Sequence, residues 1–203
     1  IAALCVTFYC TVIRFKKFGV SILLPLFGVD LAIATVLLAM IPFFTILFTP
    51  LFGALVDKVG KATLWMIVGS AMVLVSHLII TFAPQGEPMY AYIAIALLGI
   101  GYSLVPSAMW PSVPKIIPEK NLGTAYSLIY WVQNLGMWAV PIYVGRIFKK
   151  EITEAGNITQ EITAAIHAEY VFIFLGIVAI ATAMMLYHSS RRHPELRLDE
   201  PAQ

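Results

Sequence analysis

Charged residues are scarce in this chain. Asp, Glu, Lys and Arg make up 12% of its 203 residues, whereas 60% of the residues are apolar. Because about a quarter of the residues in a water-soluble domain are charged, there are too few charges here to cover a soluble surface. A surface that faces lipid needs no such cover. The shortage of charge excludes a water-soluble fold and predicts an integral membrane protein.

Motifs of catalysis and cofactor binding are also missing. The sequence has no GxxxxGK[ST] phosphate loop, no HExxH zinc motif and no nucleophile elbow. Its two cysteines, Cys5 and Cys10, lie in one apolar stretch without CxxC spacing, which indicates packed thiols. No basic run with interleaved aromatic residues suggests nucleic acid as a partner. We therefore expect no enzyme, no metal and no cofactor.

Six apolar stretches are long enough to cross a bilayer, which takes about 20 residues in a helix. They cover residues 2–27, 31–56, 62–83, 88–114, 121–148 and 167–189. Asp30 is a predicted N-cap of the second stretch. The sequence thus predicts an all-α membrane protein with a six-helix transmembrane bundle at residues 1–190 and a polar cytosolic tail at residues 191–203.

Two polar segments flank the last stretch. The alternating charges of residues 149–166 predict a short surface helix, and residues 189–203 are expected to be disordered. Asn157 opens a glycosylation sequon, which matters only in a eukaryotic host. The chain starts with Ile1 and shows no signal-peptide pattern, so we expect it to begin inside a longer protein.

Lysine and arginine are distributed unevenly between the two sets of turns. One set carries Lys58, Lys61, Lys115, Lys120, Arg191, Arg192 and Arg197. The opposite set carries only Arg146, Lys149 and Lys150, which oppose the bias. Because positively charged loops stay in the cytosol, both termini are predicted to be cytosolic. The membrane itself is left open: a bacterial inner membrane, or a eukaryotic lysosomal or plasma membrane.

Prolines interrupt several of the predicted spans, at Pro42, Pro50, Pro106, Pro111, Pro114 and Pro141. Proline removes a backbone donor and bends a helix. Such breaks survive in a membrane where neighbouring helices or a wet cavity satisfy the freed carbonyls. A passive anchor does not need them, so they favour a transporter or a channel.

The turn after the second span carries a recognisable motif. Gly53 is followed by Asp57-Lys58-Val59-Gly60-Lys61, which resembles the GxxxDxxGK/R loop of the major facilitator superfamily. We expect Gly53 to allow close helix approach, Asp57 to cap a helix N-terminus and Gly60 to permit a sharp turn. Lys58 and Lys61 would hold the loop on the cytosolic side. In the family this loop latches the two halves together; the alternative is an ordinary charged hairpin.

Other segments narrow the resemblance. Several further segments look like the C-terminal half of the lysosomal dipeptide uniporter branch and its bacterial relatives. They are Ser76-His77 after the loop and residues 108–111, 118–119, 122–126 and 133–136. The resemblance implies a fold of two six-helix bundles that alternate access to a central site. This chain would supply helices seven to twelve, and its partner would be the N-terminal half of the same protein. The arginine at position 14 differs from the neutral residue or proline expected of the animal members of this branch. The identity of the substrate is therefore left undecided.

A cationic stripe marks the first candidate substrate site. At 100° per residue, Arg14 and Lys17 share a stripe about 80° wide with Thr7, Cys10 and Ser21. A cation at the bilayer centre costs roughly 2.5–3.5 kcal/mol. We therefore expect Arg14 and Lys17 to face the cavity between the two halves and to attract a carboxylate. The alternative is that the span breaks at Arg14 and leaves the cations at an interface.

A second stripe lies on the fifth span and could hydrogen-bond a peptide-like substrate. It comprises Tyr126, Tyr130, Gln133 and Asn134. Helix packing would explain it equally well. Weaker candidates on the fourth span are Tyr102, Ser103, Ser107 and Trp110. His77 is expected to pack rather than to relay protons, and no acidic residue is expected deep in a span.

The leading hypothesis is an alternating-access secondary transporter for a small solute, with a dipeptide or an organic anion as substrate. Two alternatives stay open. One is a six-helix membrane scaffold or assembly factor that has kept a carrier fold. The other is a self-contained six-span channel.

Overall fold

The computed structural model describes residues 1–201 and is almost entirely helical. Two 3₁₀ turns, η1 (Glu119–Asn121) and η2 (Pro194–Leu196), accompany six long helices. The long helices are α1 (Ala2–Phe27), α2 (Leu31–Val59), α3 (Ala62–Phe82), α4 (Pro88–Ile116), α5 (Leu122–Glu151) and α6 (Ile158–Arg192).

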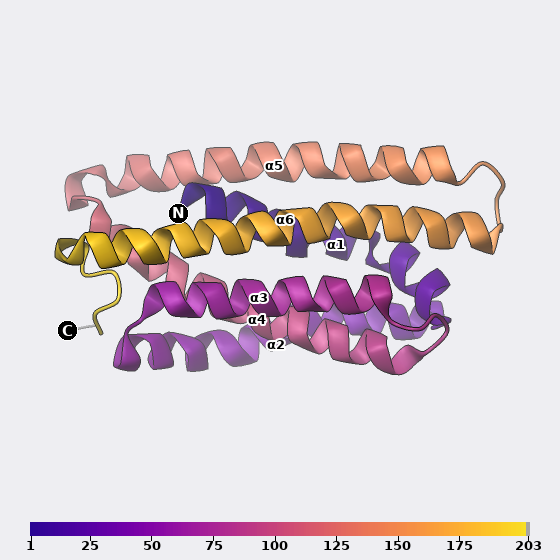
Figure 1. Ribbon diagram of the computed structural model, residues 1–203, viewed down its shortest axis with the longest axis horizontal. Coiled ribbons are helices and arrows are strands. Elements are labelled where there is room, and N and C mark those ends of the chain that lie inside the picture. The colour runs from indigo at the N-terminus through magenta and orange to yellow at the C-terminus, as the bar shows by residue number, and fades with distance from the viewer. Residues whose placement is uncertain (202–203) are drawn as a thin grey trace.

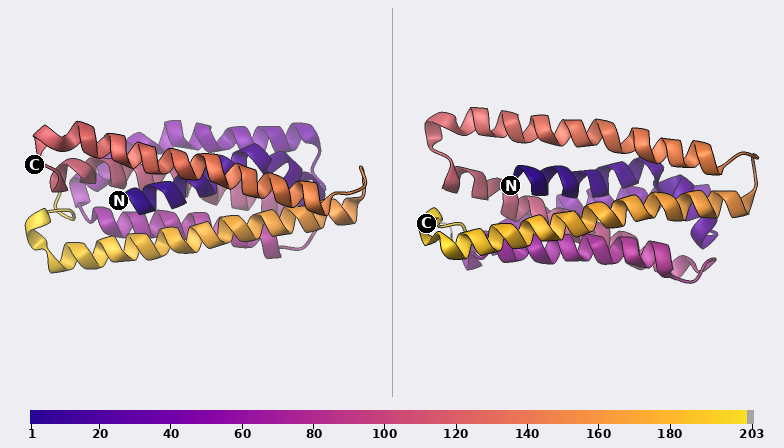
Figure 2. Two further views of the ribbon diagram at one scale, coloured as in Figure 1. Left: turned by 90° about the horizontal axis from the view of Figure 1, so that it is seen from above. Right: turned by 45° about the horizontal axis from the view of Figure 1, so that its top comes forward.

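The helices run along one common long axis (Figures 1 and 2). Both termini lie at the end of the molecule that carries the α2–α3 and α4–α5 connections, and the other three connections lie at the opposite end (Figure 1). This up-and-down order is the arrangement that six spans require. Where the bilayer begins and ends on each helix stays a prediction.

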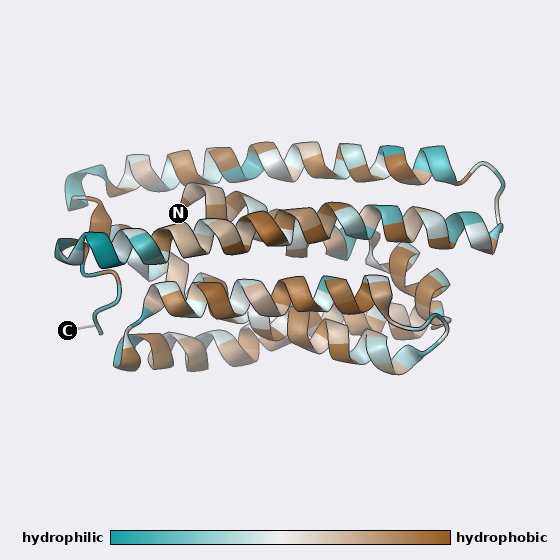
Figure 3. Ribbon diagram, viewed as in Figure 1, coloured by the Kyte–Doolittle hydropathy of each residue, from teal (hydrophilic) through white to brown (hydrophobic). Residues whose placement is uncertain are grey.

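Length and composition single out α2, α3, α4 and α6 as helices that could cross a membrane. The apolar residues lie mainly in the middle of the bundle, and hydrophilic residues gather at its ends (Figure 3). The two remaining helices are long but more polar. Arg14, Lys16 and Lys17 interrupt α1, and α5 is rich in tyrosine, tryptophan and amide side chains. These two helices therefore need polar surroundings along part of their length.

Helix α4 packs closely against both α2 and α3. Small residues allow the α3–α4 contact: a Cβ added at Gly101 would lie 2.7 Å from the carbonyl oxygen of Gly69. Such close approach of backbones is the usual way in which membrane helices associate. By contrast, α5 buries only Ile129 and Val144. The bundle is thus tightly packed around α4 and open around α5.

A fully buried contact between a histidine and a glutamate joins α3 to α6. His77 Nδ1 and Glu169 Oε2 are 2.7 Å apart, and both side chains have no exposed surface. The rings of Phe15 and Phe172 pack on His77. Glu169 is therefore an acidic residue buried inside the bundle, which the sequence pattern did not indicate. His77 does pack, but with a partner that its own sequence neighbourhood did not reveal.

Residues 149–166 do not form the expected short surface helix. They are divided between the end of α5 and the start of α6, with a loop over residues 152–157. Gln160 Oε1 accepts hydrogen bonds from the backbone N–H groups of Thr153 (2.9 Å) and Glu154 (3.1 Å). Asn157 caps α6 by accepting from the N–H of Gln160 at 3.3 Å. The helix continues without a break because Ala164 and Ala165 are buried against the bundle.

The C-terminal tail is ordered through Pro201, contrary to the expected disorder; only residues 202–203 lie outside the described part. Leu198 is buried. The Asp199 carboxylate accepts hydrogen bonds from the Thr63 N–H (2.9 Å), the Thr63 hydroxyl (2.8 Å) and the Ser190 hydroxyl (2.7 Å). Lys115 Nζ donates to the carbonyl of Glu200 at 2.8 Å. The tail is thereby fastened to the first turn of α3.

Candidate substrate site

Aromatic side chains from three helices meet at one place on the bundle. We call Tyr9 (α1), Tyr102 and Trp110 (α4), and Tyr126 and Tyr130 (α5) the aromatic cluster. The Trp110 Nε1–H donates a hydrogen bond to Tyr9 Oη at 2.9 Å. Trp110 stacks on Tyr130 with ring centroids 5.1 Å apart and lies 5.9 Å from the ring of Tyr126. Tyr9 and Tyr102 meet edge to face at 5.9 Å.

Helical spacing explains why these residues converge. Tyr126 and Tyr130 are four residues apart, and Tyr102 and Trp110 are eight apart, so each pair shares one helix face. The predicted residues Trp110, Tyr126 and Tyr130 are therefore brought together. Tyr9 was missed, because a lone tyrosine in an apolar run has no signal of its own; only its tertiary partner Trp110 identifies it.

The two amide residues of the α5 stripe have different surroundings. Gln133 is half-buried, and its Oε1 accepts a weak hydrogen bond from Cys5 Sγ at 3.2 Å. Asn134 is exposed on the open side of α5. Gly136, close by on the same helix, lies directly against Val6 and Cys10 of α1. Gln133 thus belongs to the α1–α5 contact, while Asn134 stays free to meet another molecule.

The cationic residues lie on a continuous helix. Helix α1 runs unbroken from Ala2 to Phe27, so the helix itself does not break at Arg14; whether the membrane-spanning part of α1 ends there stays a prediction. Arg14 is half-buried, and its Nε is buried without a hydrogen-bond partner among residues 1–201. Lys17 is exposed, with Nζ 5.8 Å from the centroid of the Phe18 ring. No salt bridge in the described part of the chain involves either cation.

Part of the predicted stripe is used for packing. Cys10 is buried against α5, and the Thr7 hydroxyl donates to the backbone carbonyl of Ala3 at 2.8 Å. Lys17 and Ser21 are exposed, and Arg14 is half-buried with its Nε covered. Arg14 follows Tyr9 by five residues, which is about 7.5 Å along the helix axis. Five residues also turn the side chain by about 140°, so Arg14 and Tyr9 lie at adjacent levels of α1 but point to different faces of the helix.

The two serines of α4 are not available to a substrate. The Ser103 hydroxyl donates to the carbonyl of Gly99 at 2.8 Å, and the Ser107 hydroxyl donates to that of Ser103 at 2.7 Å. Both side chains are buried. Serine commonly bonds back to its own helix when no polar partner is near. Of the weaker candidates on this helix, only Tyr102 and Trp110 reach the site.

The loop motif adopts one of its three expected local structures. Gly60 has φ 70° and makes the sharp turn as predicted. Asp57 instead lies exposed in the last turn of α2 and caps no helix. A Cβ added at Gly53 would meet no described atom within 4 Å, so this glycine brings no two helices of the described chain together. The N-cap position of α3 is Lys61, at φ 57°, whose side chain makes no capping bond.

Asp199 takes over the capping role that was expected of Asp57. A lysine cannot accept a hydrogen bond, so the first turn of α3 needs an acceptor from elsewhere. The Asp199 carboxylate and its backbone carbonyl, which accepts from the Lys61 N–H at 2.8 Å, supply it. Lys58 and Lys61 remain exposed. Sequence reasoning missed this contact because it joins residues 136 positions apart.

Comparison with known proteins gives consistent matches. The family model described as the Major Facilitator Superfamily matches residues 1–141, which contain the whole candidate site. The lysosomal dipeptide transporter MFSD1 of Homo sapiens is 35% identical over 144 residues, 71% of this chain and 30% of that protein. The protein of the same name from Danio rerio is 29% identical over 184 residues, 91% of this chain and 36% of that protein. The chain spans about a third of the length of these relatives.

Proposed function

The chain belongs to the Major Facilitator Superfamily, and from this premise we propose that it is the C-terminal half of a secondary transporter for a small solute that carries a carboxylate. Substrate binding would shift the balance between inward-open and outward-open states of the whole protein. The observation that carries the proposal is Arg14, a half-buried cation whose Nε is buried without a hydrogen-bond partner among residues 1–201.

The chemistry of the site favours an anionic group. An arginine in a membrane helix is costly unless a partner or a wet cavity compensates it, and a carboxylate is the partner that guanidinium binds best. Helices α1 and α4 contain no Asp or Glu, and the only carboxylate of α5 is Glu151 at its end. The site on this chain therefore recognises the acidic end of a substrate rather than an amine.

A dipeptide suits the remaining features. Its carboxylate would meet Arg14 and Lys17, and its peptide group and side chains would lie against Tyr9, Trp110 and Tyr130. Aromatic surfaces with a few polar atoms are typical of small-molecule sites. The relatives are named as lysosomal dipeptide transporters, which supports this substrate class. The amino group of a dipeptide would have to be recognised by residues outside this chain.

We place the partner half against the open side of the bundle. Large apolar side chains are exposed along α2 and α5, among them Phe43, Ile46, Trp131 and Trp138. An N-terminal six-helix half would cover part of these faces and close the cavity over Arg14. The distribution of lysine and arginine between the turns supports a cytosolic location of both termini.

The test is uptake into liposomes that contain the full-length protein. Dipeptides and small organic acids are compared as radiolabelled substrates. Replacing Arg14 by Gln is expected to raise the KM for the substrate by roughly ten- to a hundredfold, because a charge-assisted hydrogen bond of about 1.5–3 kcal/mol is lost. Arg14→Lys should lose less, and Lys120→Gln in the η1 turn is the matched control for loss of a cation.

Two results would overturn the proposal. Unchanged KM in the double variant Arg14→Gln, Lys17→Gln would show that the cations do not contact the substrate. No uptake and no thermal stabilisation by any substrate class, from protein that is folded in detergent, would favour the membrane scaffold instead.

A further inference from the structure

A groove between α5 and α6 lies on the other side of α5 from the aromatic cluster. Its volume is about 860 Å³, and twelve residues of these two helices line it. It exists because α5 packs on α1 more than on α6. None of its lining residues belongs to the candidate substrate site.

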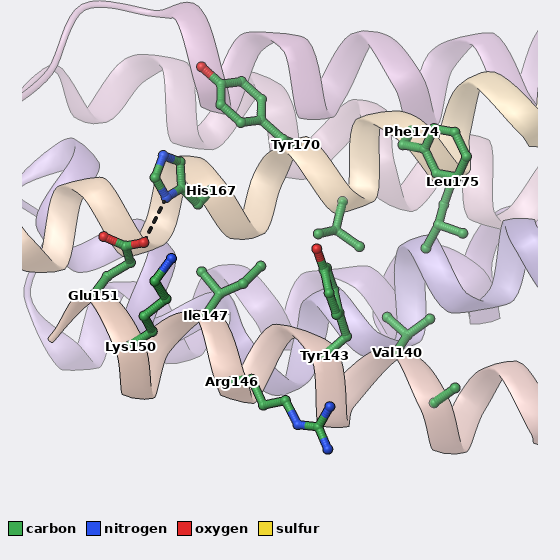
Figure 4. A pocket seen from close by; sticks show the side chains of 12 residues that line it. Val140, Tyr143, Arg146, Ile147, Lys150, Glu151, His167, Tyr170, Phe174 and Leu175 are labelled. Atoms are coloured by element: carbon green, nitrogen blue, oxygen red, sulfur yellow. Dashed lines mark hydrogen bonds and ion pairs between the residues drawn. The ribbon is translucent and has the colours of Figure 1, made fainter.

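The groove is polar at one end and apolar at the other (Figure 4). Lys150, Glu151 and His167 gather at the end near the α5–α6 loop, with Glu151 Oε1 3.3 Å from His167 Nδ1. Val140, Phe174 and Leu175 form the opposite end (Figure 4). Tyr143 and Tyr170 lie between them. The order along the groove is therefore charge, then tyrosine, then hydrocarbon.

The depth of this gradient matches a membrane interface. Residues 171–187 of α6 contain no charged side chain, and such a run covers most of the roughly 30 Å of a hydrocarbon core. Tyrosines at its edge are typical of the interfacial aromatic belt. The charged end of the groove thus lies at the level of lipid headgroups, and its apolar end lies at the level of acyl chains.

The charged end carries a surplus of positive charge. Two cations, Lys150 and Arg146, line the groove beside a single carboxylate, Glu151, and neither cation forms a salt bridge among residues 1–201. Both cations are exposed. Together with Lys149 they are the three cations on the side of the bundle that is otherwise poor in lysine and arginine.

We propose that this groove binds one anionic phospholipid, with its phosphate at Lys150 and an acyl chain along Val140, Phe174 and Leu175. Arg146 lines the groove, but its guanidinium points away from Lys150 (Figure 4) and would turn toward the phosphate on binding. Neither a zwitterionic lipid nor a soluble anion matches both ends: the first would leave the surplus charge uncompensated, and the second would leave the apolar end empty. Lipid bound here would fill the gap between α5 and α6 without entering the substrate site.

The experiment is native mass spectrometry of the detergent-purified full-length protein with phosphatidylglycerol or phosphatidylcholine of identical acyl chains. We expect at least fivefold tighter binding of phosphatidylglycerol. The double variant Arg146→Gln, Lys150→Gln should remove this preference, because each lysine or arginine near a headgroup adds a favourable electrostatic contribution. Lys149→Gln is the matched control, since Lys149 is exposed on the same turn but does not line the groove.

A second variant tests the apolar end without changing charge. Leu175→Trp should fill the groove and weaken both lipids equally. Three results would overturn the proposal: equal affinity for the two lipids, an equal loss in Lys149→Gln, or glycerol phosphate binding as tightly as the lipid. Substrate uptake by the variants is a separate measurement, so failure of the lipid site leaves the transport proposal untouched.

Discussion

Helices α4 and α5 are nearly equal in length, at 29 and 30 residues, yet they have opposite roles in the bundle. Helix α4 packs against α2 and α3 and buries fourteen residues. Helix α5 buries only two. Both contribute rings to the aromatic cluster. One helix therefore fixes the position of the site, and the other leaves it accessible.

The contrast extends to the buried polar groups. On the packed side, His77 Nδ1 and Glu169 Oε2 meet each other in the interior, while His77 Nε2 and Glu169 Oε1 have no partner among the described residues. On the open side, Arg14 has no partner among the described residues for its buried Nε. The contact between His77 and Glu169 stabilises the frame, whereas the Arg14 guanidinium has no carboxylate partner among the described residues and is available to an anionic ligand. The predictions that follow test this division, beginning with the largest effect on stability.

Removing one member of the buried pair should have the largest effect. Glu169→Leu leaves His77 without its partner in the interior, and breaking a buried ion pair costs about 3–5 kcal/mol. We expect this loss in the free energy of unfolding, measured by chemical denaturation in detergent. The double variant with His77→Leu should recover part of it, because no unpaired group remains. A single variant as stable as Glu151→Leu, at the exposed end of α5, would show that the pair is not structural.

Replacing a glycine by alanine should lower the stability of the protein on the packed side, at α4, and raise it on the open side, at α5. Gly101→Ala puts a methyl group 2.7 Å from the carbonyl oxygen of Gly69, and overpacking of this kind costs about 1–3 kcal/mol. Gly145→Ala on α5 meets nothing within 4 Å and should stabilise the helix by about 0.5–1 kcal/mol. Thermal unfolding of the two variants gives the comparison. Equal effects would mean that another part of the protein packs on Gly145.

Loss of the tail contact should have a moderate effect. Asp199→Ala removes the hydrogen-bond acceptor for the first turn of α3. Loss of a helix cap lowers the free energy of unfolding by about 0.5–2 kcal/mol. Hydrogen exchange at Thr63 and its neighbours should become faster. Glu200→Ala is the control, because its carboxylate contacts only Arg197 on the surface. Unchanged exchange in the Asp199 variant would contradict the docking of the tail.

The smallest effect on stability is expected at the aromatic cluster. Trp110→Phe keeps an aromatic ring but loses the Nε1–H that bonds Tyr9. One such hydrogen bond contributes about 0.5–1.5 kcal/mol, so unfolding should change little while the KM for uptake rises roughly two- to tenfold. Phe52, an aromatic residue of α2 away from the cluster, gives a control as Phe52→Leu. A stability loss larger than that of Gly101→Ala would assign Trp110 to the frame instead.

The candidate site was only partly predictable. Spacing along one helix was enough to group Tyr126 with Tyr130, because residues four apart share a helix face. It could not find Tyr9, whose role depends on Trp110, a residue 101 positions away. The loop motif likewise predicted Asp57, which is near α3 in the sequence, as the helix cap. In the structure the C-terminal tail brings Asp199 to that position instead.

The sequence by itself determined the membrane class, the helical character and the family, because these follow from composition, the lengths of apolar runs and a short motif. It also determined the turn at Gly60, where backbone conformation depends on one residue. Only the tertiary structure decided which polar groups are paired and which are free. Glu169 and Arg14 are both charged residues in apolar surroundings, and nothing local distinguishes them. Their difference arises from the helices that happen to face them, and that is a property of packing between distant segments.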